Sequence, residues 1–140
     1  MPVNYSIPDR FESQRLFLRP YQAGDGPMYY AVGQKNRQHL QPYEADNAIL
    51  SPKTEQEAEA LVQELAVDWA VRNCFFLGAF DRLSAEFVAQ IYIGVVNWDT
   101  PEFEVGFFVD QDHEGQGYVT EAVCTALGFV FDHLHAQRVS

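Results

Sequence analysis

Basic residues are scarce in this sequence. The 140 residues include 9 Lys and Arg against 20 Asp and Glu, which gives a formal net charge of −11 at pH 7. Binding to nucleic acid or to an anionic membrane requires clustered Lys and Arg that neutralise phosphate. No apolar run approaches the roughly 20 residues of a membrane-spanning helix. We therefore expect neither nucleic acid nor a membrane among the partners.

Cysteine is also scarce, because the chain contains only Cys74 and Cys124. The two lie far apart and no signal peptide precedes them, so we expect neither a disulfide framework nor a zinc site. The four histidines have no metal-binding spacing either, and we expect no metal. Both cysteines are predicted to be small core residues of a cytoplasmic protein.

Hydrophobic residues make up 47% of the chain, enough for one domain with a core over residues 1–140. Residues 1–12 are predicted to form an N-terminal arm. The alternation in Arg15–Arg19 then predicts a strand that ends at Pro20. Asp25–Pro27 is typical of a helix start, and the polar stretch 33–50 predicts a loop or short irregular helices.

The rest of the chain has clearer periodicity. Apolar residues at helical spacing predict a helix that begins within Ser51–Glu55 and continues to Trp69. Three successive strands, another helix and the start of a last strand follow, over Cys74–Phe80, Phe87–Trp98, Glu102–Val109, Tyr118–Leu134 and Gln137–Val139. This order indicates a mixed α+β fold, in which helices pack on a mixed sheet.

A glycine-rich turn lies between the Glu102–Val109 strand and the helix after it. A strand, a glycine loop and a helix start in this order can offer backbone N–H groups to a diphosphate. Gly115 and Gly117 would let the main chain approach the ligand. Two alternatives are a tight turn without a ligand and a dinucleotide-binding fold. The latter needs a small residue at Thr120 and usually lies in the first unit of a parallel sheet.

The segment Glu104–Val139 resembles the acetyl-CoA-binding core of the GNAT N-acetyltransferases. The run Gly117–Ala122 is similar to the Gly-Tyr-Ala-Thr-Glu-Ala run of one branch, which acetylates N-terminal alanines of ribosomal proteins. Arg15–Pro20 resembles the opening strand of that branch. The family motif is Gln/Arg-x-x-Gly-x-Gly/Ala, and Gly117 is its central glycine. Glu114 replaces the Gln or Arg and puts a carboxylate beside the expected pyrophosphate. Val119 replaces the small residue at the end of the motif.

The resemblance implies a mostly antiparallel central sheet with helices on both faces and acetyl-CoA as co-substrate. It implies backbone contacts to the pantetheine arm from Phe107, Phe108 and Val109. The pyrophosphate would be held by the loop and first helical turn, Glu114, Gly115, Gln116, Gly117, Tyr118, Val119 and Thr120. From the residues themselves, Gly106 predicts a bulge in this strand, which would free backbone groups from the ladder.

Acetyl transfer needs a neutral amine and a donor for the developing oxyanion. Strand N–H groups near Phe107 can supply the donor. The resemblance places an acidic residue at Glu104, which is either the base, acting through water, or a solvated strand residue. An α-amine, with a pKa near 8, is easier to deprotonate than Lys by roughly 3 kcal/mol. We therefore expect the N-terminus of a peptide or protein, or a small amine, as acceptor. Tyr43 and Trp98 either line the acceptor pocket or only pack on the body of the protein.

The resemblance also implies C-terminal strands beyond Ser140. Without them the Glu102–Val109 strand would keep an exposed apolar edge, which proteins normally cover. Three explanations stay open: a truncated chain, a second chain that completes the sheet as a homo-oligomer, or a non-catalytic acyl-CoA-binding or interaction module.

Overall fold

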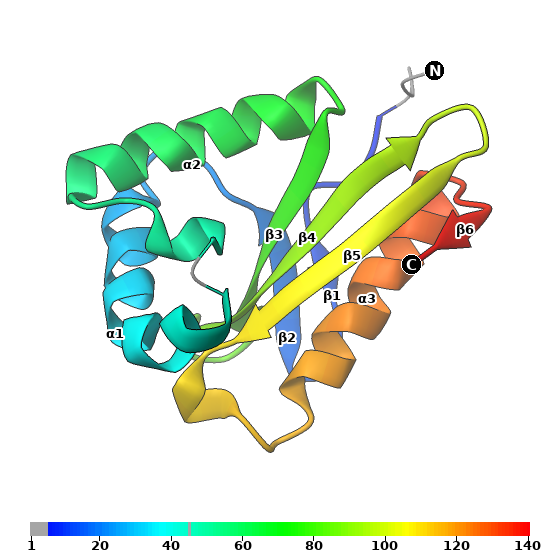
Figure 1. The fold of residues 1–140 in the computed structure, drawn as a ribbon. Coiled ribbons are helices and arrows are strands. Elements are labelled where there is room, and N and C mark those ends of the chain that lie inside the picture. Colours follow the sequence, from blue (N-terminus) through cyan, green and yellow to red (C-terminus); the bar gives the residue numbers. More distant parts are fainter. Residues whose placement is uncertain (1–5, 45) are drawn as a thin grey trace.

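The computed structural model describes residues 6–44 and 46–140, and within them six strands form one sheet. The strands follow each other in chain order, and only the last pair is parallel (Figure 1). They are β1 (Phe11–Glu12), β2 (Leu16–Pro20), β3 (Cys74–Asp81), β4 (Phe87–Asn97), β5 (Glu102–Val109) and β6 (Arg138–Val139). The expected mixed, mostly antiparallel sheet is confirmed.

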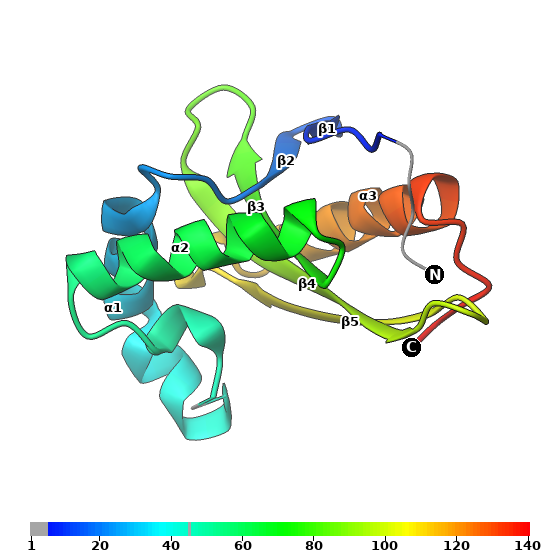
Figure 2. The ribbon, with the colours of Figure 1, turned by 90° about the horizontal axis from the view of Figure 1, so that it is seen from above.

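Helices cover both faces of this sheet, as expected. In the described residues, α1 (Gly26–Glu44) and α2 (Glu55–Ala70) lie on one side and α3 (Tyr118–His133) on the other (Figure 2). Two short 3₁₀ helices, η1 (Ala48–Leu50) and η2 (Gln111–His113), lie in the connections. The α+β class read from the sequence therefore holds.

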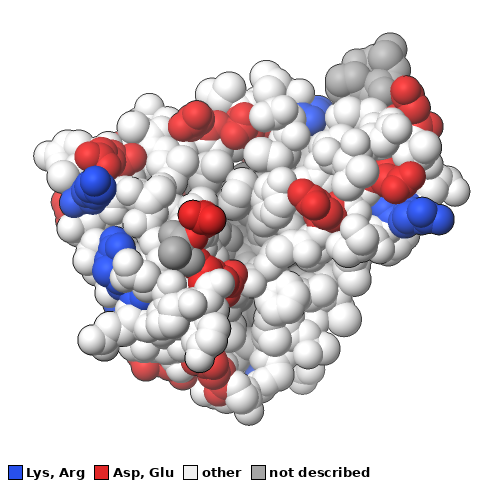
Figure 3. Space-filling model, in the orientation of Figure 1, with Lys and Arg blue, Asp and Glu red and all other residues white. Residues whose placement is uncertain are grey.

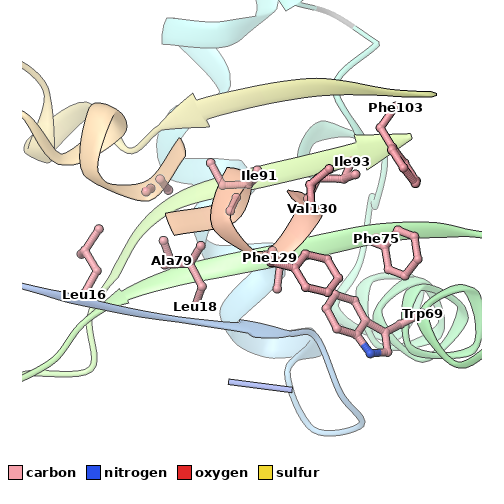
Figure 4. Packing of buried hydrophobic residues seen from close by; sticks show 14 of the residues in the cluster. Leu16, Leu18, Trp69, Phe75, Ala79, Ile91, Ile93, Phe103, Phe129 and Val130 are labelled. Carbon is pink, nitrogen blue, oxygen red and sulfur yellow. The ribbon is translucent and has the colours of Figure 1, made fainter. Parts of the chain in front are cut away.

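Two hydrophobic clusters hold the helices on the sheet. The cluster on the α3 side contains Phe75, Ile91 and Phe129, together with Trp69 from the end of α2 (Figure 4). The Trp69 and Phe129 rings stack with centroids 5.3 Å apart. The cluster on the other side joins α1 and α2 to the sheet and includes Phe108. The side chains of β5 are thus divided between two separate cores.

The helix predicted to follow Ser51–Glu55 is α2. The Thr54 side chain accepts a hydrogen bond from the Glu57 N–H, which caps the first turn. Ala58, Val62, Leu65 and Trp69 are its buried residues. The predicted helical face is confirmed.

The prediction of a loop or short irregular helices over residues 33–50 is wrong up to Glu44, where α1 ends, whereas η1 is a short helix of the predicted kind. Its buried face continues past Val32 through Asn36 and Leu40. Asn36 is completely buried, and its amide donates to the Val32 carbonyl and to Asp110. A polar residue at a core position therefore hid the periodicity. Pro42 lies in the last turn of α1, where it cannot donate a hydrogen bond to the carbonyl four residues earlier.

The arm predicted over residues 1–12 contains a strand in its last part. Residues 1–5 lie outside the described part of the chain, but Phe11 and Glu12 pair with Leu18 and Phe17 of β2. The Phe11 ring lies 4.9 Å from that of Phe129. Packing on α3 therefore orders a segment that has no periodicity in the sequence.

The bulge predicted at Gly106 is also wrong. The pairing of β5 with β4 runs without interruption through Gly106, which lies opposite Tyr92. The register shift is in β4, between Val95 and Asn97. Gly106 instead leaves the Tyr92 ring uncovered, because a Cβ there would be in ordinary contact with it at 3.7 Å.

Candidate functional site

The glycine turn ends in an open helix N-terminus. Gly115 and Gly117 have φ of +74° and +80°, and Gly117 is the N-cap residue of α3. Glycine has no side chain that could cap the helix, so the N–H groups of Tyr118, Val119 and Thr120 keep their hydrogen-bonding capacity. Such groups, aligned with the helix dipole, favour an anion. The turn has the backbone geometry that a diphosphate requires.

The carboxylates of this turn are paired with side chains of α1. Glu114 Oε1 lies 3.2 Å from His39 Nε2. Lys35 Nζ lies 2.6 Å from Asp112 Oδ2. The Lys35–Asp112 ion pair reduces the negative charge that the turn would present to an anionic ligand.

Asp110, directly after β5, connects the turn to α1. It is 1% exposed and accepts hydrogen bonds from Asn36 Nδ2 at 2.8 Å and Lys35 Nζ at 3.0 Å. The ring nitrogen Nδ1 of His113 lies 3.0 Å from Asp110 Oδ2. Asn36 in turn accepts from the Gln111 N–H at 2.9 Å. No pattern in the sequence indicates this cluster, because its members come from distant parts of the chain.

Burial opposes the ionisation of Asp110, but the hydrogen bonds from Asn36, Lys35 and His113 outweigh it and lower the pKa. A lowered pKa adds stability above the unfolded pKa of about 3.9, and this stability is lost as the pH falls through the folded value. We expect Asp110→Asn to lose about 1–3 kcal/mol of unfolding free energy at pH 7. The loss should shrink below about pH 4.

Thermal unfolding between pH 2 and 7 measures this difference. Asp112→Asn is the matched control, because the Asp112 side chain is 65% exposed and should change stability little. An Asp110→Asn variant as stable as the wild type at pH 7 would contradict the assignment.

The other side of the turn is held by β2 and the residues before it. Glu121, in the first turn of α3, accepts from the backbone N–H and the Nε of Arg15, each at 2.7 Å, and from the Ser13 hydroxyl. Arg15 also donates to the Gln116 carbonyl at 3.0 Å and lies 4.0 Å above the Tyr118 ring. The turn is therefore fixed from two sides before any ligand binds.

The edge of β5 is covered only at its start. The Val105 N–H donates to the Ser140 carbonyl and the Ser140 N–H to the Phe103 carbonyl, each at 3.0 Å. Backbone groups alternate in direction along a strand, so Phe107 presents its N–H and C=O on the same edge. On this outer edge, no described strand pairs with β5 at Phe107, whereas β4 pairs with the other edge. The exposed edge expected from the sequence is thus restricted to the end of β5 that is nearer the glycine turn.

Two grooves meet at this free edge. The first, the α3 groove, has a volume of about 210 Å³ and is lined by Phe107, Val119, Thr120, Val123 and Cys124. Cys124 is exposed, so the expectation that it is a core residue was wrong, and Cys74 is only partly buried. The second, the α1 groove, has a volume of about 290 Å³ and lies on the opposite face of the sheet, against the end of α1. Its lining residues are Glu44, Asp46, Asn47, Ala48, Phe76, Gln90, Tyr92, Gly106, Phe107 and Phe108.

Glu104 lies beside the α1 groove, where the Tyr92 hydroxyl is 3.4 Å from its Oε1. Gly94 lies opposite Glu104 in the ladder, and a Cβ at Gly94 would collide with the Tyr92 hydroxyl. Burial, and then the nearby Glu104 carboxylate, raise the pKa of Tyr92. Tyr92 thus remains a protonated donor. Sequence reasoning missed it, because one tyrosine in a strand gives no signal.

Tyr43 and Trp98, the two aromatic residues considered for the acceptor pocket, line neither of these grooves. Tyr43 is 88% exposed on the last turn of α1, and its neighbour Glu44 lines the groove instead. Trp98 packs edge-on against Phe103, at 5.3 Å, and Phe75, in the core on the α3 side. Of the aromatic residues of β5, Phe107 is 52% exposed, whereas Phe108 is buried against α1 and α2.

Two classes of site have no counterpart in the described residues. No three His, Cys, Asp or Glu side chains are grouped so that they could hold a metal ion. Within the same residues, no helix combines the length and apolar character needed to cross a membrane.

Comparison with known proteins gives matches at the levels of family and fold. A family model described as an acetyltransferase (GNAT) domain matches residues 15–140. No curated protein matches the chain.

Several solved structures share the fold. The ribosomal-protein-S5-alanine acetyltransferase from Vibrio fischeri superposes with a TM-score of 0.80 at 18% identity, over 93% of this chain and 71% of that one. A ribosomal-protein-serine acetyltransferase described for Vibrio cholerae gives 0.73 at 22% identity, over 99% and 74%. RimL, a ribosomal L7/L12 α-N-protein acetyltransferase in complex with coenzyme A, gives 0.74 at 17% identity, over 89% and 66%.

Proposed function

Since the chain belongs to the GNAT acetyltransferase family, we propose that it transfers the acetyl group of acetyl-CoA to the α-amine of a peptide or protein N-terminus. The observation that carries this proposal is the position of Phe107. Phe107 lines both grooves, and its backbone N–H lies on the free edge between them. A donor in one groove and an acceptor in the other would meet at this residue.

The cofactor side of the proposal rests on two adjacent features. The open N-terminus of α3, with Gly115 to Thr120, suits the diphosphate of coenzyme A. The free edge of β5 suits the amide groups of the pantetheine arm, which can pair with Phe107 and Val109 as an added strand would. The α3 groove joins the two, because Phe107 and Thr120 both line it.

The transfer is direct attack in a ternary complex. The neutral amine forms the new C–N bond, the C–S bond breaks, and one proton passes from nitrogen to the departing sulfur, so that charge balances. The Phe107 N–H can stabilise the developing oxyanion. Glu104 accepts the amine proton through water, and Tyr92 orients its carboxylate by a hydrogen bond.

The choice of an α-amine follows from its acidity. Deprotonating an α-amine at pH 7 costs roughly 3 kcal/mol less than deprotonating a Lys side chain. An exposed carboxylate is a weak base and suits the easier substrate. RimL, which shares the fold and is described as an α-N-protein acetyltransferase, is consistent with this choice.

The test is acetyl-CoA turnover with a panel of acceptors that includes N-terminal peptides, the same peptides with blocked α-amines and an internal Lys, and small amines. We expect free coenzyme A to appear only with an open amine and fastest with the α-amine peptides. Calorimetric binding of coenzyme A without turnover of any acceptor would indicate a non-catalytic acyl-CoA-binding module. Absence of both would reject the proposal.

Glu104→Gln should lower kcat/KM by about 100-fold at pH 7, because general bases contribute about 10²–10⁴. The defect should shrink above about pH 8, where the α-amine loses its proton unaided. Glu102→Gln is the matched control, since Glu102 lies two residues earlier on the same strand face. A pH–rate profile of the three proteins measures this, and an unchanged rate for Glu104→Gln would remove Glu104 from the mechanism.

A further inference from the structure

The floor of the α1 groove is aromatic. Phe76, Tyr92 and Phe108 come from three neighbouring strands and share one face of the sheet. The rings of Phe76 and Tyr92 lie 4.9 Å apart. Aromatic faces attract organic cations through their negative quadrupole. This floor therefore suits an alkylammonium group as well as an apolar chain.

The rim of the same groove is acidic. Glu44 and Asp46 line it at the end of α1, and Glu104 lies beside Tyr92. None of the described lining residues is Lys or Arg. Figure 3 shows acidic residues on both sides of the central hollow and no basic residue within it. Neither Glu44 nor Asp46 forms an ion pair with a residue that the structure describes. Both residues are exposed, so a ligand in the groove can contact their carboxylates.

A buried amide adds a third feature. Gln90 lines the groove although it is only 4% exposed, and its Oε1 accepts a hydrogen bond from the Tyr21 hydroxyl at 2.9 Å. The engaged oxygen leaves the N–H donors of this amide, one of which can serve the buried Tyr29 hydroxyl. The other can bind a peptide carbonyl. The groove thus combines contacts for a cation with a contact for a peptide backbone.

Building on the transfer proposed above, we infer that the α1 groove selects acceptors with a second positive charge close to the reacting amine. The substrate class is a peptide N-terminus with Lys or Arg among its first residues. A linear polyamine shares the cationic chemistry but lacks the carbonyl that Gln90 can bind. Glu44 and Asp46 are the residues that determine this specificity.

The experiment compares peptides of equal length that begin with the same residue and carry Lys, Gln or Glu at the second and third positions, with a linear triamine as a further acceptor. Each exposed ion pair changes an equilibrium by up to about fivefold. We expect kcat/KM to be about tenfold higher for the Lys peptide than for the Gln peptide at low salt, and lowest for the Glu peptide. The preference should diminish near 0.5 M salt, because ions screen exposed charges.

The variant Glu44→Gln/Asp46→Asn should remove most of this preference, because kcat/KM for the Lys peptide falls toward that for the Gln peptide. Glu64→Gln/Glu55→Gln is the control, because it removes the same charge from exposed positions of α2. In the control the Lys preference should persist. Triamine turnover at the rate of the Lys peptide would support the cationic class and assign the contact to charge alone.

Equal kcat/KM for the three peptides would overturn the inference while leaving the proposed transfer in place. The inference would also be overturned if the Glu44→Gln/Asp46→Asn variant retained the preference for the Lys peptide. If no acceptor turns over, titration of the peptides into the protein with coenzyme A decides the matter separately. Tighter binding of the Lys peptide, lost in this variant, would support the inference, and equal binding would reject it.

Discussion

Replacing Phe107 by proline should lower kcat by at least about 100-fold, because proline has no N–H. The loss of one oxyanion donor typically lowers the rate by about 10²–10³. Proline is tolerated on a strand edge whose N–H groups point away from the sheet. The Phe107 N–H points to the free edge of β5 and not to β4. The ladder with β4 should therefore survive the substitution. Single-turnover kinetics with saturating acetyl-CoA and an α-amine peptide measure the loss.

The variant Phe107→Ala distinguishes the contribution of the backbone N–H from that of the aromatic ring. It keeps the N–H but removes the ring, which strand alternation places on the α3 side of the sheet, in the α3 groove. We expect it to raise KM for acetyl-CoA while kcat stays within about tenfold of the wild type. Circular dichroism and thermal unfolding of both variants test whether the strand is intact. A folded Phe107→Pro variant with the kcat of Phe107→Ala would contradict the role of this N–H.

The second large effect is expected for Gly117→Val, which should raise the Kd of coenzyme A by at least about tenfold. Space does not limit this position, since a Cβ would be 3.5 Å from Arg15 Nη2. The constraint is the φ of +80°. An L-residue costs about 1–2 kcal/mol there, and a β-branched one costs more. The turn would relax, and its N–H groups would no longer converge on a diphosphate. Calorimetric titration with coenzyme A measures the change.

Gly24→Val provides the control for strain alone. Gly24 has φ of +97° with open space around it, and it lies before α1, away from the glycine turn. Both valine variants should unfold at lower temperature than the wild type, but only Gly117→Val should bind coenzyme A more weakly. Wild-type affinity in Gly117→Val would show that the helix N-terminus does not hold the diphosphate.

Local patterns were sufficient for the elements that carry the turn. Alternation identified β5 at its observed bounds, and helical spacing identified α3 to within one residue. Patterning failed where a polar residue is buried. Asn36 lies on the core face of α1 because Asp110, from the end of β5, is its hydrogen-bonding partner. No short window of sequence contains both residues.

The bulge predicted at Gly106 shows a second limit of prediction from sequence patterns. A glycine in a strand marks either a kink or a place where a neighbour needs room, and the residues around Gly106 do not distinguish these two cases. The structure places the Tyr92 ring against Gly106 and the irregularity in β4. Likewise Tyr43 and Trp98 were chosen for their type and position in the chain, whereas Glu44 and Tyr92 line the groove.

The sequence by itself determined the order of strands and helices, the acidic charge and the glycine turn, because each depends on residues that are close together in the chain. The tertiary structure alone decided which side chains meet at that turn and around Phe107. Such contacts depend on strand register and on how α1 and α3 pack across the sheet, and these are set by burial between distant segments. The fixation of the turn by Glu121 and Asp110, and the acidic rim of the α1 groove, follow from that packing.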